Sequence, residues 1–413
     1  MSRRVVITGL GAVTPLGGDV PTTWQALLEG RSGAGPITRF DSTAFTVHFA
    51  CEVKAFDPLQ YMDRKDAKRL DAYSRYAMAA SVQAMRDAGL EHGGFDENRF
   101  GVIIGSGIGG LQAFEDQHSQ YLQRGPGKIS PFFIPMFILD MAAGHVSMKY
   151  GLKGPNYAVV SACATSGHAI GDAMRIIQYG DADLMIAGGA EAAVTPMSVG
   201  GFASMQALST RNESPETASR PFDAARDGFV IGEGSGSVVL EEREHALRRG
   251  ARIYAEIVGY GATADAYHMT QPAPEGAGAQ RSMRRALEDA GVRPEDVDYI
   301  NAHGTSTPYN DRNESTAIKA VFGDHAYKLN VSSTKSATGH TLGASGAIEF
   351  IISTLAVNNG IVPPTINYST PDPECDLNYT PNTPAHREVN LAISNSFGFG
   401  GHNVTLAVRK HSA

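Results

Sequence analysis

The chain has 413 residues, of which 42% are hydrophobic and 19% are charged. These proportions are typical of a globular protein and argue against a disordered or coiled-coil chain. The formal net charge of −8 argues against nucleic-acid binding, because that function normally needs a basic surface. At about 150 residues per unit, the length predicts two or three structural units.

The cysteines and the apolar segments predict where the protein works. The chain has three cysteines, Cys51, Cys163 and Cys375. Because their number is odd and no two have a Cys-x-x-Cys spacing, neither a disulfide framework nor a zinc ribbon is indicated. The apolar run at 5–8 is too short for a signal peptide. No segment reaches the ~18 apolar residues that a membrane helix needs. We therefore expect a cytoplasmic protein without a membrane span.

Short β-branched runs that end in glycine recur along the chain and are typical of strands that turn into helices. They lie at 5–11, 102–110, 158–167, 184–189, 297–304 and 329–339. Longer segments with helical periodicity follow two of them, at 168–179 and 343–357. This alternation predicts an α/β protein with a mainly buried sheet.

The strand-to-helix junctions recur in the same order in the two halves of the chain. Blocks near Val5, Phe100, Tyr157 and Asp183 resemble later blocks near Ile253, Val297, Leu329 and Asn390. The best match sets 160–168 beside 331–340, each followed by an amphipathic helix. Chance similarity is the alternative, because Ser, Thr, Gly and Ala are common residues.

A duplication would divide the chain into halves at 1–250 and 251–413, packed as one body with the reactive groups at their junction. Segments 111–150 and 190–225 would then be insertions, suited to a dimer contact or a substrate tunnel.

Cys163 follows the strand-like segment 157–161 and precedes a helical segment. Its sulfur is therefore expected at a helix N-terminus, where backbone N–H groups and the helix dipole favour the thiolate over the thiol. This position predicts a nucleophile with a pKa below the usual ~8.5. A buried apolar cysteine is the alternative.

Two histidines, His303 and His340, follow similar junctions in the second half. Their separation excludes a local metal motif such as His-x-x-x-His, and we expect no metal site. If the halves superpose, both loops end at the same edge of the sheet as Cys163. Two imidazoles beside one sulfur suit acyl chemistry, since each can donate a hydrogen bond to a developing oxyanion. A structural role for either histidine is the alternative.

Further candidates flank these residues. Lys335 and Glu349 lie before and after His340, where an ion pair could hold that histidine or could be a surface salt bridge worth ~0 to 1 kcal/mol. The glycine-rich segment 395–403 can direct N–H groups toward an oxyanion, or it can be a plain hairpin loop. Glycine clusters at 9–17 and 105–110 lack the G-x-G-x-x-G spacing of a dinucleotide site.

Taken together, these motifs resemble the β-ketoacyl-[acyl carrier protein] synthases, condensing enzymes of the thiolase superfamily, and look closest to the bacterial type II elongation enzymes. The motifs are the Cys163 junction and segments 301–307, 331–340 and 395–401, with further likeness at 4–17, 130–133, 187–191 and 209–212. The resemblance covers essentially the whole chain. It implies a thiolase-like five-layered α-β-α-β-α fold built from two duplicated halves.

The resemblance also implies roles for individual residues. Cys163 would carry the acyl group, with the N–H groups of Cys163 and Phe399 as the oxyanion hole. His303 and His340 would assist decarboxylation of the malonyl group, and Lys335 with Glu349 would organise the histidines. Phe399 would also gate access. Residues implied to line the acyl tunnel are Ile108, Phe133 and Phe202, and those implied to bind the phosphopantetheine arm are Thr305 and Thr307.

The implied partner is an acyl carrier protein that brings acyl and malonyl groups on its own phosphopantetheine arm, so no separate cofactor is expected. Basic candidates for its docking are Arg64, Lys65, Lys68, Arg69, Arg124 and Lys128, although each can be ordinary solvated charge. A homodimer is also implied, and the apolar stretch 132–141 favours it.

Three rival functions make different demands on the sequence. A degradative thiolase would need a second cysteine in the C-terminal glycine-rich loop, where Phe399 stands instead. A chain-length factor would lack Cys163, and a carrier-binding scaffold would show no turnover.

Overall fold

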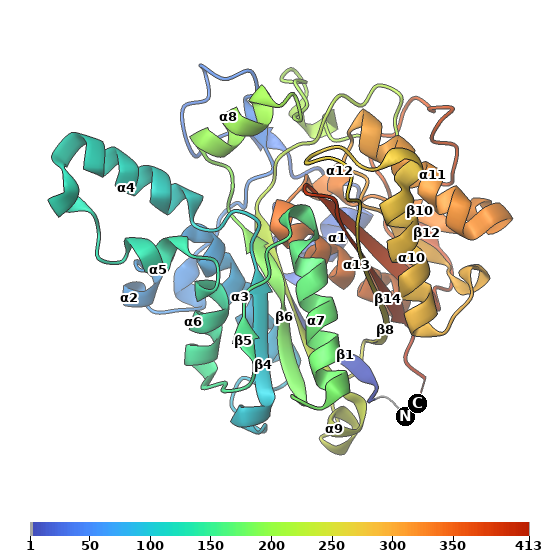
Figure 1. Ribbon diagram of the computed structural model, residues 1–413, viewed down its shortest axis with the longest axis horizontal. Coiled ribbons are helices and arrows are strands. Elements are labelled where there is room, and N and C mark those ends of the chain that lie inside the picture. Colours follow the sequence, from blue (N-terminus) through green and yellow to red (C-terminus); the bar gives the residue numbers. More distant parts are fainter. Residues whose placement is uncertain (1–2, 413) are drawn as a thin grey trace.

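Ten strands form one mixed sheet at the centre of the molecule in the computed structural model, which describes residues 3–412 (Figure 1). Their order across the sheet is β10-β9-β13-β14-β8-β1-β7-β6-β4-β5. Residues 1–2 and 413, at the outer ends of the two expected halves, lie outside the described residues.

Each half of the chain supplies one side of this sheet. The N-terminal strands are β1 (Val5–Val13), β4 (Phe100–Gly105), β5 (Asn156–Tyr157), β6 (Leu184–Glu191) and β7 (Gly234–Glu242). The C-terminal strands are β8 (Ala255–Ala264), β9 (Tyr299–Asn301), β10 (Asn330–Ser332), β13 (Leu391–Gly398) and β14 (His402–Arg409). From the edges inward they follow β5-β4-β6-β7-β1 and β10-β9-β13-β14-β8, with the same alternation of parallel and antiparallel pairs. The two sets meet where β1 pairs antiparallel with β8.

This repeated topology confirms the expected duplication, but the finer sequence match is wrong. The 3-10 turn Ala162–Ala164 and helix α7 (Thr165–Tyr179) correspond to the 3-10 turn Leu342–Ala344 and helix α13 (Ser345–Asn359). Matching 160–168 with 331–340 misses this register because the second half carries an additional short helix, α12 (Lys335–Thr338), before its turn.

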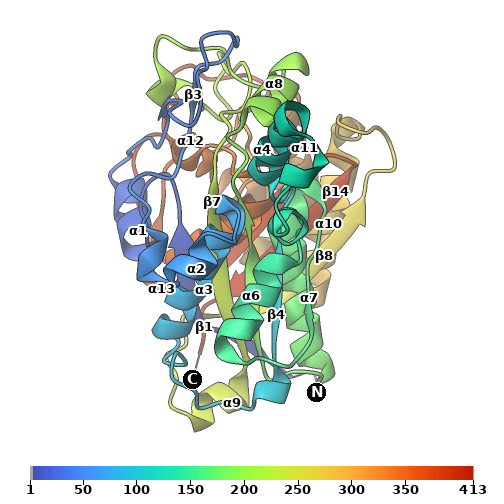
Figure 2. The same ribbon diagram turned by 90° about the vertical axis from the view of Figure 1, so that its left-hand side faces the viewer.

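Helices cover both faces of each half-sheet. Helices α3 (Ala72–Asp87) and α6 (Met141–Tyr150) pack on the outer face of the N-terminal strands (Figure 2). Helices α10 (Ala277–Ala290) and α11 (Pro308–Phe322) pack on the outer face of the C-terminal strands, and α7 and α13 lie between the two half-sheets. The expected α-β-α-β-α order of layers is confirmed.

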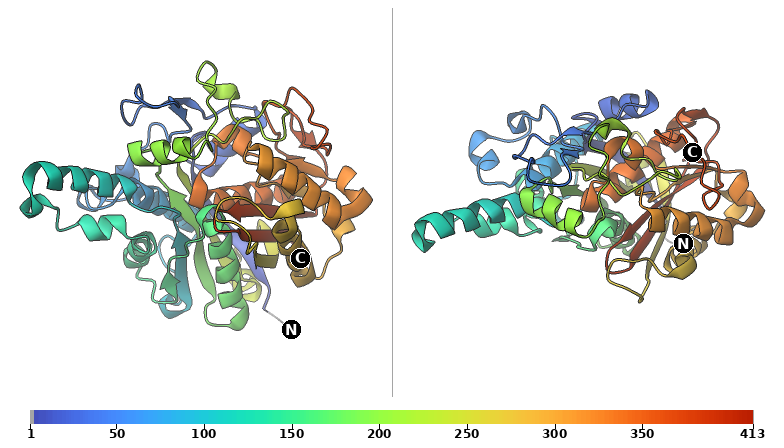
Figure 3. Two further views of the ribbon diagram at one scale, coloured as in Figure 1. Left: turned by 45° about the horizontal axis from the view of Figure 1, so that its top comes forward. Right: turned by 90° about the horizontal axis from the view of Figure 1, so that it is seen from above.

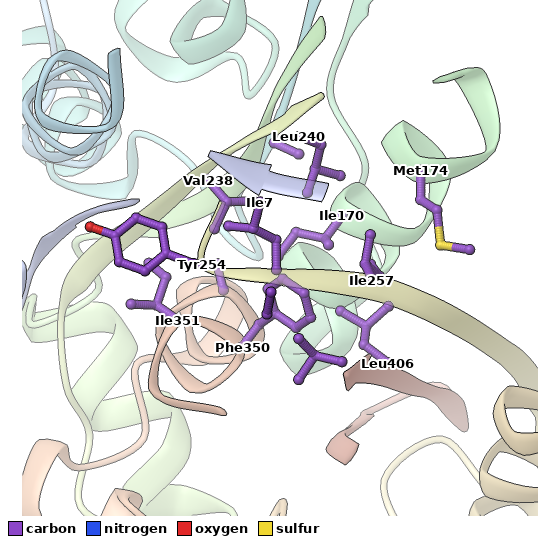
Figure 4. Packing of buried hydrophobic residues seen from close by; sticks show 14 of the residues in the cluster. Ile7, Ile170, Met174, Val238, Leu240, Tyr254, Ile257, Phe350, Ile351 and Leu406 are labelled. Atoms are coloured by element: carbon purple, nitrogen blue, oxygen red, sulfur yellow. The ribbon is translucent and has the colours of Figure 1, made fainter. Parts of the chain in front are cut away.

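Strand residues alternate between two apolar cores, as the pleat of a β-strand requires. Ile103 faces the central core between the half-sheets, whereas Val102 and Ile104 face the core under α3. Figure 4 shows the central core, where Ile7 and Phe350 lie among side chains from both halves. At ~1.5 to 3 kcal/mol for each large apolar side chain buried, this core holds the two halves in one relative position.

Helix α13 differs from its prediction. Its residues are buried from Ser345 to Val357, so it is not amphipathic as expected. Strands of both halves and α7 surround it, so the helix has no solvent-facing side on which polar residues would gather.

The two expected insertions lie outside the repeat except for α6, which lies between β4 and β5 as α11 lies between β9 and β10, so that the expected bounds 111–150 extend too far. Segment 111–150 forms α4 (Leu111–Arg124), α5 (Phe133–Phe137) and α6, and α4 projects from the body (Figure 3). Segment 190–225 contains α8 (Pro196–Ser204). The remaining elements are α1 (Val20–Leu28), α2 (Arg64–Ala67), α9 (Arg243–Arg248), β2 (Gly35–Pro36), β3 (Phe49–Ala50), β11 (Ile361–Val362) and β12 (Ala385–His386). Within residues 3–412, none of the helices has the length and apolar character needed to cross a membrane.

Candidate active site

Cys163 lies in the 3-10 turn that follows β5 and leads directly into α7. The residue before it, Ala162, has a φ of 50°, in the left-handed region that costs a non-glycine residue roughly 1 to 2 kcal/mol. The Cys163 side chain is 9% exposed. The turn therefore presents the sulfur to an enclosed space.

His340 faces this sulfur from the second half. Its Nε2 lies 3.0 Å from Sγ of Cys163, and its Nδ1 lies 3.0 Å from the hydroxyl of Ser345. Its backbone is held on both sides, because its N–H donates to the Val230 carbonyl and its carbonyl accepts from the Gly232 N–H. Burial and the nearby positive charge of Lys335 lower its pKa well below the usual value, so the ring is neutral.

His303 joins the same cluster, with its ring edge-on to that of His340 at a centroid distance of 5.4 Å. Nζ of Lys335 lies 3.4 Å from Nδ1 of His303, and an ammonium can only donate hydrogen bonds. Burial, Lys335 and His340 lower the pKa of His303 well below its usual value. The neutral ring must therefore accept at Nδ1 and carry its hydrogen on Nε2, ready to donate it.

The Lys335 ammonium forms an ion pair with Glu349, and both side chains are buried. A surface salt bridge is thereby excluded. Lys335 contacts His303 directly rather than His340, whose ring is held by Ser345. Burial raises the pKa of Glu349 to about 7, against the lowering effect of Lys335.

The glycine-rich turn between β13 and β14 closes over the cysteine. The backbone N–H groups of Phe399 and Cys163 lie near the Cys163 sulfur and act to lower the pKa of the thiol. This approach depends on Gly398, where a Cβ atom would lie 2.6 Å from the Ser161 carbonyl oxygen and 3.1 Å from the Cys163 nitrogen. The turn is therefore more than a plain hairpin loop, because its backbone forms part of the reactive site.

The expected low pKa of Cys163 is wrong for this state of the protein. Burial is the largest effect and raises the pKa of the thiol to about 12, whereas Lys335 and the two N–H groups act in the lowering direction. The sequence indicated the helix N-terminus but not the loss of water around the sulfur, which disfavours the anion.

A cavity of about 600 Å³ opens onto the cluster and brings together most of the predicted site residues. Its lining includes Cys163, His303, His340, Phe399, Ile108, Phe202, Thr305 and Thr307. The hydroxyls of Thr305 and Thr307 lie 2.9 Å apart. Phe133, which was also expected to line the acyl tunnel, does not line this cavity. It lies on α5 and packs against Phe114 and Phe137.

Two residues that sequence analysis missed hold the histidines. One is Ser345, and the other is Glu314, whose buried carboxylate accepts the N–H groups of His303 and Gly304 at 2.9 and 2.8 Å. Burial raises the pKa of Glu314 to about 7. No sequence signal separates Glu314 from the other acidic residues of the chain.

Sequence comparison supports the family suggested by this geometry. The profile of the β-ketoacyl synthase N-terminal domain matches residues 2–246, and that of the β-ketoacyl synthase C-terminal domain matches residues 254–369.

The chain belongs to the β-ketoacyl synthase family. It is 56% identical over 409 residues to a 3-oxoacyl-[acyl-carrier-protein] synthase 2 of Synechocystis, covering 99% of this chain and 98% of that protein. A protein of the same name from Staphylococcus aureus is 53% identical over 412 residues, covering 100% and 99%.

Solved structures agree. A ketosynthase assembly, described as a type II PKS acyl-carrier protein in complex with its ketosynthase bound to the hexaketide, has a TM-score of 0.93 at 38% identity, with full coverage of both chains. A β-ketoacyl synthase from Burkholderia phymatum has a TM-score of 0.93 at 37% identity, covering 99% and 100%. This β-ketoacyl synthase is a condensing acyltransferase.

Cys375 packs in the outer core of the C-terminal half and does not line the cavity.

Proposed function

We propose that this β-ketoacyl synthase is a 3-oxoacyl-[acyl-carrier-protein] synthase, which condenses malonyl-acyl carrier protein with an acyl group held as a thioester on Cys163, in fatty acid biosynthesis. The observation that carries the proposal is the contact between Sγ of Cys163 and Nε2 of His340, with His303 in the same cavity. A sulfur nucleophile with two neutral imidazoles is the minimum set for the two half-reactions.

In the first half-reaction, the Cys163 sulfur attacks the thioester carbonyl of an acylated carrier. His340 takes the thiol proton through Nε2, which lies within hydrogen-bond reach. The N–H groups of Phe399 and Cys163 stabilise the oxyanion, each such donor being worth ~2.7 to 4 kcal/mol. The carbon–sulfur bond to the carrier then breaks, and His340 gives the proton to the leaving sulfur, so that the carrier leaves as a thiol.

In the second half-reaction, the malonyl group loses carbon dioxide, and the electron pair of the broken bond forms an enolate. Nε2–H of His303 donates to the enolate oxygen, and His340 donates as well in the tautomer that carries its hydrogen on Nε2 while Nδ1 accepts from the Ser345 hydroxyl. The enolate carbon attacks the acyl group on Cys163 and releases the sulfur as a thiolate, which takes up one proton from water and returns to the thiol. Lys335, held by Glu349, keeps His303 in the tautomer that this step needs.

The cavity lining suits the two parts of the substrate. Ile108 and Phe202 would contact the acyl chain, and the hydroxyls of Thr305 and Thr307 would bind the amides of the phosphopantetheine arm. The ring centroid of Phe399 lies 6.5 Å from that of Phe202. Phe399 would gate the passage between the site of the phosphopantetheine arm and the site of the acyl chain. The carrier supplies the thiol arm and decarboxylation supplies the driving force, so we propose that no metal or further cofactor takes part.

A homodimer is part of this proposal. Apolar side chains of the α4–α5 segment are exposed, and large exposed apolar patches mark interaction sites. The exposed residues are Phe114, Tyr121, Leu122, Ile129, Phe132 and Ile134. In a dimer formed through this segment, Phe133 could complete the tunnel of the partner subunit. A cytoplasmic location is supported by the three cysteines, which are all free.

The test follows the acyl group. Incubation of the purified protein with octanoyl-carrier protein should add one octanoyl mass to Cys163, and addition of malonyl-carrier protein should release it as 3-oxodecanoyl-carrier protein. The Cys163→Ala variant should show neither event. An unmodified wild-type mass, or loss of the adduct by hydrolysis alone, contradicts the proposal.

A further inference from the structure

Glu191 is a fully buried carboxylate at the end of β6 that touches none of the reactive groups described above. It accepts four hydrogen bonds. Its Oε1 accepts from the Ser106 hydroxyl at 2.8 Å and the Ile108 N–H at 3.1 Å. Its Oε2 accepts from the N–H groups of Gly107 at 2.8 Å and Gly343 at 2.9 Å.

These bonds join the two halves of the chain beside Cys163. Ser106, Gly107 and Ile108 follow β4 of the first half, whereas Gly343 belongs to the 3-10 turn of the second half. Ile108 and Leu342, the neighbour of Gly343, both line the cavity and lie in the same apolar cluster as Cys163. One carboxylate thus holds together two pieces of the apolar cavity wall, one from each half of the chain.

The duplication explains why a carboxylate stands there. Gly343 is the counterpart of Cys163, and the residues before them, Leu342 and Ala162, have matching φ values of 48° and 50°. In the first half this turn carries the Cys163 sulfur, whereas in the second half its N–H donates to Glu191. The second turn has no nucleophile and serves as a wall.

The site has no room for another arrangement. A Cβ atom on Gly343 would lie 2.3 Å from the Gly107 nitrogen, and one on Gly107 would lie 2.7 Å from Oε2 of Glu191. Ser106 accepts the N–H of Gly109 at 3.0 Å, so its own hydrogen goes to Glu191. All four partners are therefore donors, and an amide in place of the carboxylate would set its NH₂ group against at least one backbone N–H.

We infer that Glu191 is a positioning residue that sets the spacing of Ile108 and Leu342, and thereby the length of acyl chain that Cys163 accepts. The inference rests on the proposed function. A short acyl group needs only the sulfur and the oxyanion hole, whereas a long chain must also fit against the apolar wall that Ile108 and Leu342 form. Displacement of this wall should therefore penalise long chains more than short ones.

The experiment measures kcat/KM for acylation of Cys163 by butyryl-, octanoyl- and palmitoyl-carrier protein. For Glu191→Gln we expect a loss of about tenfold or more with the longest chain that the wild type accepts, and of less than about threefold with butyryl, in the range that a misfitted apolar pocket costs. Ser106→Ala removes one of the four bonds and should shift the profile in the same direction by less.

Glu241→Gln is the matched control. Glu241 is also a fully buried carboxylate, but it pairs with Arg249 and His245. It lies on β7 opposite Leu184, at the end of the β6–β7 pair away from Glu191. Its loss should therefore leave the chain-length profile unchanged. Equal losses at all chain lengths in Glu191→Gln overturn the inference. If that variant does not fold, an unshifted profile in Ser106→Ala overturns it. If the wild type accepts no acyl group at all, the proposed function itself is contradicted. Failure of the proposed function is thus distinguishable from failure of the inference about Glu191.

Discussion

Sγ of Cys163 and Nε2 of His340 lie 3.0 Å apart although 177 residues separate them in the chain. Each comes from a loop at the same end of the sheet, one in each half. The contact therefore depends on the packing of the two halves across α7 and α13. Under the proposed function, this contact gives a thiol of high pKa a proton acceptor within hydrogen-bond reach.

The resting thiol should react slowly with iodoacetamide. Because burial raises the pKa of Cys163 to about 12, the thiolate fraction should rise about tenfold per pH unit across the neutral and mildly alkaline range. The alkylation rate of the wild type, followed by intact mass against pH, measures this. A plateau near neutral pH would show a stable thiolate and contradict the assignment.

His303→Ala should separate the two half-reactions. His303 has no hydrogen bond to the sulfur, whereas its Nε2–H is available to an enolate, so decarboxylation of malonyl-carrier protein should fall by about 10² to 10⁴-fold. Octanoylation of Cys163 should fall much less. Release of carbon dioxide and the octanoyl adduct are measured in parallel, and equal retention of both would remove this role.

Phe399→Ala tests the ring separately from the backbone, because the variant keeps the backbone N–H of residue 399 beside the Cys163 sulfur. We expect altered kinetics of acylation in a folded enzyme, since the ring stands beside Phe202 at the passage to the acyl cavity. Stopped-flow mass analysis of acylation measures it. Unchanged rates would argue against a gate.

Gly398→Ala tests the backbone. The new Cβ would lie 2.6 Å from the Ser161 carbonyl oxygen, so the turn must move and take the Phe399 N–H with it. Loss of one oxyanion donor typically lowers kcat by about 10² to 10³-fold. Gly127→Ala is the control, because a Cβ there meets open space. Comparable activity in both variants would show that the Phe399 N–H is not used.

The buried pair of Lys335 and Glu349 should couple in stability. Lys335→Met leaves a buried carboxylate without its partner and should lower the free energy of unfolding by about 3 to 5 kcal/mol. The double variant with Glu349→Gln should recover part of that loss. Lys153→Met, at the exposed pair with Glu97, should cost less than about 1 kcal/mol. Urea denaturation of the wild type, Lys335→Met, Glu349→Gln, their double variant and Lys153→Met measures this, and additive losses would deny the coupling.

Much of the fold was predictable because local sequence carries its causes. Glycine after a β-branched run marks a strand that must turn sharply, and the repeated order of such junctions predicted two similar halves. The turn that carries Cys163 and the loops that carry the histidines were indicated in the same way. The register between the halves was not predictable in detail, because α12 interrupts the second copy without changing the residue types around it.

The sequence by itself determined which groups the site contains: one sulfur, two imidazoles, a lysine with a carboxylate, and a flexible glycine-rich backbone. Only the tertiary structure decided their states, because burial depends on contacts between distant segments. Exclusion of water raises the pKa of Cys163 and lowers that of both histidines, and packing brings Lys335 to His303 rather than to His340. The same long-range packing joins Glu191 to both halves, a relationship that no local pattern encodes.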